Sequence, residues 1–135
     1  MKISKLIILF IFILSLNIIW EFSHYRLYID LTGIPPTLHL IIASFTDLLL
    51  ISLIFLINSF YKKDINWIEK PKKSDYTLIV ISGIIIAIII EIYSTTNKRW
   101  AYTEAMPVIF GVGLSPLIQL FTTAIISLLL IKIIK

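Results

Sequence analysis

Four stretches of mostly apolar residues dominate the chain, and each has the length of about 20 residues that a helix needs to cross a bilayer. They cover residues 3–22, 37–60, 75–93 and 115–134. Charged residues make up only 15% of the chain, whereas soluble domains contain about 25%. Too few charges remain to give such helices a surface that faces water. The sequence therefore predicts an all-α integral membrane four-helix bundle that forms a single domain over residues 1–135.

Local signals indicate where the helices begin. Gly33-Ile34-Pro35-Pro36 breaks the chain before the second stretch and leaves Thr37 as its expected cap. Ser74 is the expected cap of the third helix, and Ser115 with Pro116 suits the start of the fourth. The first stretch has a basic start but no small-residue cleavage site, so we expect an uncleaved transmembrane helix and not a signal peptide.

Lysine and arginine are unevenly distributed between the segments that flank the four stretches. Nine of the twelve basic residues lie at the N-terminus, in the middle loop or at the C-terminus: Lys2, Lys5, Lys62, Lys63, Lys70, Lys72, Lys73, Lys132 and Lys135. The positive-inside rule therefore predicts a multi-pass protein of the cell membrane with its N-terminus and C-terminus in the cytoplasm. We attribute the basic middle loop to topology and anionic lipid, with no nucleic-acid partner, and expect its Trp67 to be an interfacial anchor.

Polar residues within the stretches gather toward the ends that this topology places on the outer side. Asn17, Glu21 and His24 are spaced by four and three residues and so share one helix face. Asp47 lies roughly 15 Å into the second helix, where a carboxylate that faced lipid would cost about 2.5 to 3.5 kcal/mol. We therefore expect Asp47, near mid-bilayer, to face the interior of the bundle, whereas Glu91 is expected near the outer end of the third helix.

These positions predict one shared intramembrane site. Its candidate catalytic residues are an acid cluster of Glu21, Asp47 and Glu91. Its candidate substrate-binding residues complete the cluster and close it from the outer side: His24, His39, Arg99, Trp100, Tyr102 and Gln119. Ionisable residues inside a membrane are functional candidates by default.

Structural explanations for the same residues stay open. Asp47 could be bonded to Ser44 or to a backbone carbonyl and serve only to lock helix packing. Glu21 and Glu91 could lie at the headgroup level and pair with Arg26, Lys98 or Arg99. The tryptophans and tyrosines could form an aromatic belt at the membrane interface without any chemical role.

Several kinds of chemistry are not indicated. The chain contains no cysteine, which excludes disulfides and thiolate catalysis. It also contains none of the serine-hydrolase, zinc-protease or phosphate-loop motifs. The spacing of His24 and His39 relative to the carboxylates matches no recognised metal-binding pattern. We therefore expect neither a metal nor a cofactor.

The segment between the third and fourth helices is unusual for so apolar a chain. Residues 97–107, N-K-R-W-A-Y-T-E-A-M-P, are predicted to form a lid over the acid cluster, with Arg99 and Tyr102 facing down into it. Residues 107–114 are apolar but broken by glycine. They are expected to form a re-entrant or interfacial segment, or a loop packed on the helices.

Motifs along nearly the whole chain resemble those of a family of small, functionally uncharacterised four-helix membrane proteins. They are W-E at Trp20, the acid at Asp47, E-x7-R-W-x-Y-x3-M-P from Glu91 and G-L-S-P-x2-Q from Gly113. The resemblance implies a four-helix membrane fold and no particular activity. The chain is more faintly similar to membrane isoprenoid cyclases of the lycopene-cyclase type, which also carry intramembrane carboxylates and a tryptophan-tyrosine segment.

Three functions fit these observations, and whether the chain is an enzyme is left open. The first is binding of, or acid catalysis on, a lipid or isoprenoid, in which a protonated carboxyl group of Asp47 or Glu91 acts as the acid and Glu21 as its partner. The second is a subunit that binds a protein partner within a membrane complex. The third is a small proton- or cation-coupled transporter, which would work as a homo-oligomer because four helices leave little room for a pathway.

Overall fold

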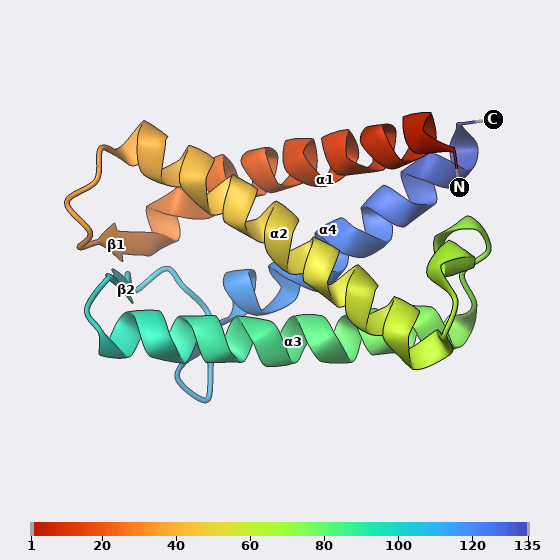
Figure 1. Cartoon of the computed structure of the whole chain (residues 1–135). Helices are drawn as coiled ribbons and strands as arrows, with labels where there is room; N and C mark the ends of the chain where they lie inside the picture. The colour runs from red at the N-terminus through yellow and green to blue at the C-terminus, as the bar shows by residue number, and fades with distance from the viewer. Residues whose placement is uncertain (1, 135) are drawn as a thin grey trace.

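The computed structural model describes residues 2–134, so Met1 and Lys135, which the domain prediction and the count of cytoplasmic charges include, lie outside the described residues. Four helices form the molecule (Figure 1): α1 (Ile3–His24), α2 (Pro36–Lys62), α3 (Lys73–Thr96) and α4 (Leu114–Ile133). All four are long and apolar enough to span a membrane. The predicted all-α bundle of four helices is therefore confirmed, with helix ends at most three residues from the expected ones.

The helices pack as a bundle in which α2 runs diagonally across the others (Figure 1). Helices α2 and α3 come together where a short 3-10 turn, η2 (Ile65–Glu69), connects them, and they separate toward the opposite end. At that opposite end lie the 3-10 turn η1 (Tyr25–Leu27) and two short strands, β1 (Tyr28–Asp30) and β2 (Trp100–Tyr102). The separation leaves room between α2 and α3 beneath the strands.

The starts of α2, α3 and α4 differ from the predicted caps. Helix α2 begins at Pro36, which suits the first helical position, and α4 begins after Gly113; neither has a side-chain cap, so Thr37 and Ser115 lie inside their helices. Helix α3 is capped instead by Asp75, whose Oδ2 accepts a hydrogen bond from the Lys72 backbone N–H at 2.6 Å. The three predicted caps were wrong because a serine or threonine near a break only indicates a cap, whereas the backbone path decides which residue provides it.

The core fills the end of the bundle where α2 and α3 meet. Much of it consists of fully buried aliphatic side chains from all four helices: Leu9, Ile13, Ile51, Ile54, Ile79, Ala124 and Leu128. Trp67 of η2 joins this core with 2% of its surface exposed, donates to Ser59 Oγ at 2.9 Å and packs edge-on against Phe55. Trp67 is therefore a core residue, and the prediction of an interfacial anchor was wrong.

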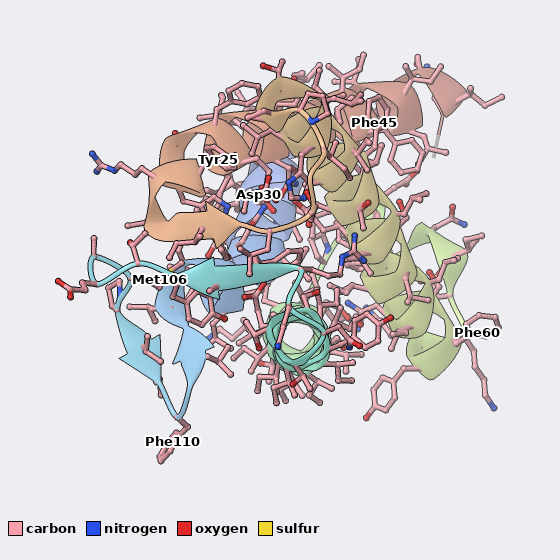
Figure 2. The ribbon with its side chains drawn as sticks, turned by 90° about the vertical axis from the view of Figure 1, so that its left-hand side faces the viewer. Tyr25, Asp30, Phe45, Phe60, Met106 and Phe110 are labelled. Carbon is pink, nitrogen blue, oxygen red and sulfur yellow. The ribbon has the colours of Figure 1, made fainter. Side chains whose placement is uncertain are left out.

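Residues 107–114 form a small hairpin of β3 (Val108–Ile109) and β4 (Val112–Gly113). Phe110 and Gly111 at its tip have φ values of 49° and 81°, as a two-residue turn with both residues in the left-handed region requires. Phe110 is fully exposed and points away from the bundle (Figure 2). The segment is therefore a hairpin whose second strand, Val112–Gly113, is buried and whose apolar tip at Phe110 is exposed.

Candidate functional site

A two-stranded ribbon covers the end of the bundle where α2 and α3 separate. Strands β1 and β2 are antiparallel, with Tyr28 opposite Tyr102 and Asp30 opposite Trp100. Backbone bonds from Leu31 N to Arg99 O and from Thr103 N to Leu27 O, both 3.0 Å long, extend the pairing. The ribbon therefore fixes residues 97–107 over the helix ends, where the sequence predicted a lid.

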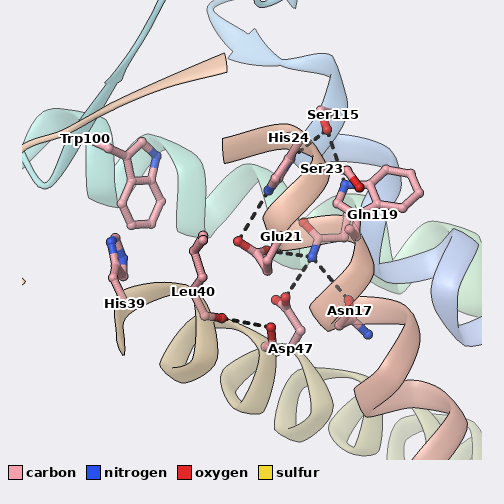
Figure 3. Close-up of polar contacts among 12 residues, drawn as sticks. Asn17, Glu21, Ser23, His24, His39, Leu40, Asp47, Trp100, Ser115 and Gln119 are labelled. Atoms are coloured by element: carbon pink, nitrogen blue, oxygen red, sulfur yellow. Dashed lines mark hydrogen bonds and ion pairs between the residues drawn. The ribbon is translucent and has the colours of Figure 1, made fainter. Parts of the chain in front are cut away.

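The inner group of polar side chains is organised by Gln119 of α4 (Figure 3). Its Nε2 donates to Glu21 Oε1 and to Asp47 Oδ2, both at 2.7 Å, and lies 3.2 Å from Asn17 Oδ1. An amide nitrogen has only two hydrogens, so the two shorter contacts account for both. Because both carboxyl oxygens contact the same nitrogen, Glu21 and Asp47 are close neighbours.

A chain of hydrogen bonds holds the second oxygen of Glu21. Trp20 Nε1 donates to Ser115 Oγ at 3.2 Å, and Ser115 Oγ lies 2.7 Å from His24 Nδ1. His24 Nε2 lies 3.3 Å from Glu21 Oε2. Since a carboxylate oxygen can only accept, His24 carries a hydrogen on Nε2, and in the neutral ring Ser115 then donates to the Nδ1 lone pair. Both oxygens of Glu21 thus accept hydrogen bonds, as an ionised carboxylate does.

Glu91 of α3 belongs to a separate group beneath the ribbon. Its Oε2 accepts from Tyr102 OH and from Trp100 Nε1, the latter at 3.2 Å. Glu91 is 4% exposed. Burial, followed by the hydrogen bond to Glu91, raises the pKa of Tyr102, so this hydroxyl remains a donor to Glu91 at neutral pH. The other carboxyl oxygen of Glu91 has no hydrogen bond to a described residue.

A third group, the pair Asp30 and His39, joins the ribbon to the start of α2. His39 Nδ1 is hydrogen-bonded to Asp30 Oδ2, and the His39 ring lies beside Trp100 with a centroid distance of 6.3 Å (Figure 3). Arg99 is exposed, with its guanidinium carbon 6.0 Å from the centre of the Trp100 ring.

One cavity of about 490 Å³ connects these groups. Most of its wall is apolar, formed by residues such as Leu40, Leu50 and Ala87. Exposed side chains of α2 and α3 form part of its rim: Ile42, Thr46, Ile89 and Tyr93. The cavity is thus reached from the side of the bundle between α2 and α3, beneath the ribbon.

The structure brings the predicted site residues together. Eight of the nine line the cavity: Glu21, His24, His39, Asp47, Glu91, Arg99, Trp100 and Gln119. Tyr102 lies behind Glu91 and reaches the site only through it. Glu21 and Asp47 converge directly, whereas Glu91 lines the same cavity with its own partners. Within residues 2–134, neither Glu21 nor Glu91 pairs with Arg26, Lys98 or Arg99, so the alternative that invoked those pairs is wrong.

Several residues of the site were not among the predicted ones. Asp30, Ser115 and Tyr28 belong to it, and Tyr28 contributes an aromatic wall with its ring 5.1 Å from that of His24. Asp30-Leu31-Thr32 is a sequence in which the aspartate side chain binds the backbone two residues on, and this could have indicated that Asp30 is held in place. No local pattern indicated that residues 28–30 would pair with residues 100–102.

Comparisons with protein-family models, with curated proteins and with solved structures found no match. Any assignment of function to this chain therefore rests on its own geometry. That geometry comprises four helices of membrane-spanning length and one laterally open apolar cavity. Four carboxyl side chains line the cavity, those of Glu21, Asp30, Asp47 and Glu91, each held by hydrogen bonds from defined partners.

Proposed function

We propose that this chain is a multi-pass protein of the cell membrane whose cavity opens toward the outer leaflet and binds, and protonates, a lipid or isoprenoid. Large apolar side chains are exposed on the flanks of all four helices: Ile11, Leu49, Ile85 and Leu129 are examples. Such a surface is unfavourable in water and suits a bilayer. The lysine-rich end at η2 would lie in the cytoplasm with both termini, which directs the ribbon and the cavity outward.

The observation that carries the proposal is a laterally open, largely apolar cavity lined by carboxyl groups. In the described part of the chain, Glu21, Asp47 and Glu91 have no lysine or arginine partner. A ligand that enters between α2 and α3 would come from the lipid phase. Its apolar part would pack against the apolar wall of the cavity. Ligand pockets commonly combine an apolar wall with a few well-placed polar groups.

The hydrogen bonds favour different roles for the two inner acids. Both oxygens of Glu21 already accept from His24 and Gln119, so Glu21 acts as the charged partner. Asp47 accepts a single bond from Gln119, and two adjacent carboxyl groups in an apolar site share one proton because like charges repel. Asp47 is therefore the proton donor to the ligand, and Glu21 stabilises the arrangement.

Aromatic side chains suit the positive charge that protonation of an alkene would create. Tyr28 and Trp100 line the cavity with their rings 6.0 Å apart. The face of an aromatic ring attracts a cation within about 6 Å. Fully buried aliphatic side chains lie between the cavity and the lysine-rich end: Leu9, Ile13, Ile54 and Leu128. This favours a site open to one side over a transport pathway.

The test compares membrane lipids from cells that produce the wild type, Asp47→Asn or Glu91→Gln. Glu104→Gln, which changes an exposed carboxylate of the same outer loop, is the matched control. We expect one lipid or isoprenoid species to accumulate or disappear with Asp47→Asn but not with Glu104→Gln. Identical lipid profiles across all four strains, with equal protein levels, would count against the proposal.

A further inference from the structure

The pair formed by Asp30 and His39 has no role in the proton transfer assigned to Asp47. Asp30 accepts four hydrogen bonds: Oδ1 from Thr32 N at 2.9 Å and Thr32 Oγ1 at 2.6 Å, and Oδ2 from Tyr25 OH at 3.3 Å and from His39 Nδ1. Burial by itself would raise the pKa of Asp30, but the hydrogen bonds from Thr32 and His39 outweigh it and lower the pKa to about 2. The carboxylate is thus ionised and has no acceptor capacity left for a ligand.

This arrangement fixes the imidazole of His39. Because Asp30 can only accept, Nδ1 of His39 carries a hydrogen, and in the neutral imidazole Nε2 then presents a lone pair. His39 lines the cavity and retains 15% side-chain exposure, and its Nε2 has no hydrogen bond to another residue within 2–134. An acid that orients a histidine through Nδ1 and leaves Nε2 for the substrate is the usual way to prepare a hydrogen-bond or proton acceptor.

The surroundings restrict what His39 Nε2 can bind. Its partner must be a donor, because Nε2 of the neutral ring can only accept, and the largely apolar wall of the cavity favours a ligand with an apolar body. The negative charge of Asp30 is compensated by the four hydrogen bonds that it accepts. A neutral hydroxyl group on an apolar molecule meets both conditions, because its apolar part can lie along Leu40 and Ile90 of the cavity wall.

We propose that the Asp30–His39 pair is the recognition site for the hydroxyl group of a lipid or isoprenoid alcohol, in which His39 Nε2 accepts the hydroxyl hydrogen and Asp30 positions the ring. This rests on the proposed function and specifies the class of its ligand. His39 is the residue that touches the ligand, and Asp30 acts through His39.

The chain contains two histidines, so His24 is an internal control for the reactivity of His39. Diethyl pyrocarbonate acylates an imidazole nitrogen with a free lone pair, and both nitrogens of His24 are engaged by Ser115 and Glu21. In the full chain in detergent at neutral pH, we expect His39 to be acylated about tenfold faster than His24, a factor within reach of one hydrogen bond. Peptide mass spectrometry measures both rates. Equal rates would overturn the proposal.

Farnesol and its methyl ether then test whether His39 recognises the hydroxyl group of the ligand. The two probes have the same apolar chain, but only the alcohol can donate. We expect farnesol to slow acylation of His39 several-fold, with the ether much less effective at the same concentration and His24 unaffected by either. Equal protection by the two probes, or protection by neither, would overturn the hydroxyl site. Lipid retained by the purified protein, read by native mass spectrometry, would still support the proposed function in that event.

Asp30→Asn tests the positioning role with a readout that mere folding would not give. Nitrogen NMR of the histidine side chains is expected to show hydrogen on Nδ1 of His39 and on Nε2 of His24 in the wild type. In Asp30→Asn the preference of His39 and the selectivity for farnesol should both be lost, while His24 is unchanged. Asp64→Asn, which changes a carboxylate that accepts from Asn66 N at 2.8 Å in the η2 loop, should leave both histidines as in the wild type. An unchanged His39 tautomer in Asp30→Asn would refute the role of Asp30.

Discussion

Gln119 is the residue on which the inner acid pair depends, so its replacement should be unusually costly. It is 4% exposed, and its Nε2 donates to Glu21 and Asp47. Gln119→Met keeps an unbranched side chain of similar size but removes both donors. A hydrogen bond to a charged group, here Glu21, contributes about 1.5 to 3 kcal/mol, and one to a neutral group, here the protonated Asp47, about 0.5 to 1.5 kcal/mol. The loss of both predicts a destabilisation of about 2 to 4.5 kcal/mol, which for a chain of this length corresponds to a fall in Tm of roughly 10 °C.

Thermal unfolding in detergent measures this change. Intrinsic tryptophan fluorescence is the readout, because the chain has no cysteine that a thiol-reactive dye could label. Ser127→Ala is the matched control on the same helix: Ser127 is fully buried, but its hydroxyl donates only to the Thr123 carbonyl of α4. We expect a loss below about 1 kcal/mol there, since that carbonyl keeps its place in the helix. If Gln119→Met is no more destabilising than Ser127→Ala, the bridging role is refuted.

A double variant measures how strongly Gln119 and Asp47 are coupled. In Gln119→Met/Asp47→Asn the amide donor and one of its two carboxyl acceptors are replaced together. The combined loss of stability should therefore be smaller than the sum of the two single losses, by about 0.5 to 3 kcal/mol for side chains in contact. Strictly additive losses would mean that Gln119 and Asp47 are not coupled.

Three further predictions follow from other parts of the molecule. Asp30 has a pKa of about 2 against an ordinary value of 3.8, so its stabilising contribution is fully present above about pH 4 and is lost as the pH falls toward 2. The difference in Tm between the wild type and Asp30→Asn should therefore shrink in that window. A constant difference would contradict this prediction. Gly83→Ala should lower Tm by an amount that reflects about 1 to 3 kcal/mol, because the added Cβ would lie 3.0 Å from Phe121 Cβ and 3.1 Å from Phe121 N; an unchanged Tm would contradict this close approach of α3 and α4. In intact cells an impermeant maleimide should label Glu104→Cys but not Lys63→Cys, and the reverse pattern would invert the proposed topology.

The gross architecture could be predicted because membrane insertion leaves few choices. A long apolar stretch must be helical to satisfy its backbone in lipid, so length and hydropathy sufficed for α1 to α4. The acids could be predicted for a similar reason, since a carboxyl group such as Asp47 is too costly to face lipid.

The hydrogen-bond partners could not be predicted, because they depend on contacts between distant parts of the chain. Strand β1 pairs with β2 across about seventy residues, and this pairing alone brings Trp100 and Tyr102 to Glu91 and places Asp30 above His39. Periodicity reports which face of a helix is polar. It does not report that Gln119 bridges Glu21 and Asp47 or that Tyr102 donates a hydrogen bond to Glu91.

The central claim is that the cavity between α2 and α3 holds a lipid-derived ligand. Native mass spectrometry of the full chain after thorough detergent exchange tests this claim most directly. Ala43→Trp is the variant that fills the cavity from α2. Ala124→Ser, in the core away from the cavity, is the control. We predict that the wild type and Ala124→Ser each retain one lipid species of defined mass and that Ala43→Trp, folded to the same extent, retains none. Retention of the same species by Ala43→Trp, or its absence from the wild type, would contradict the account.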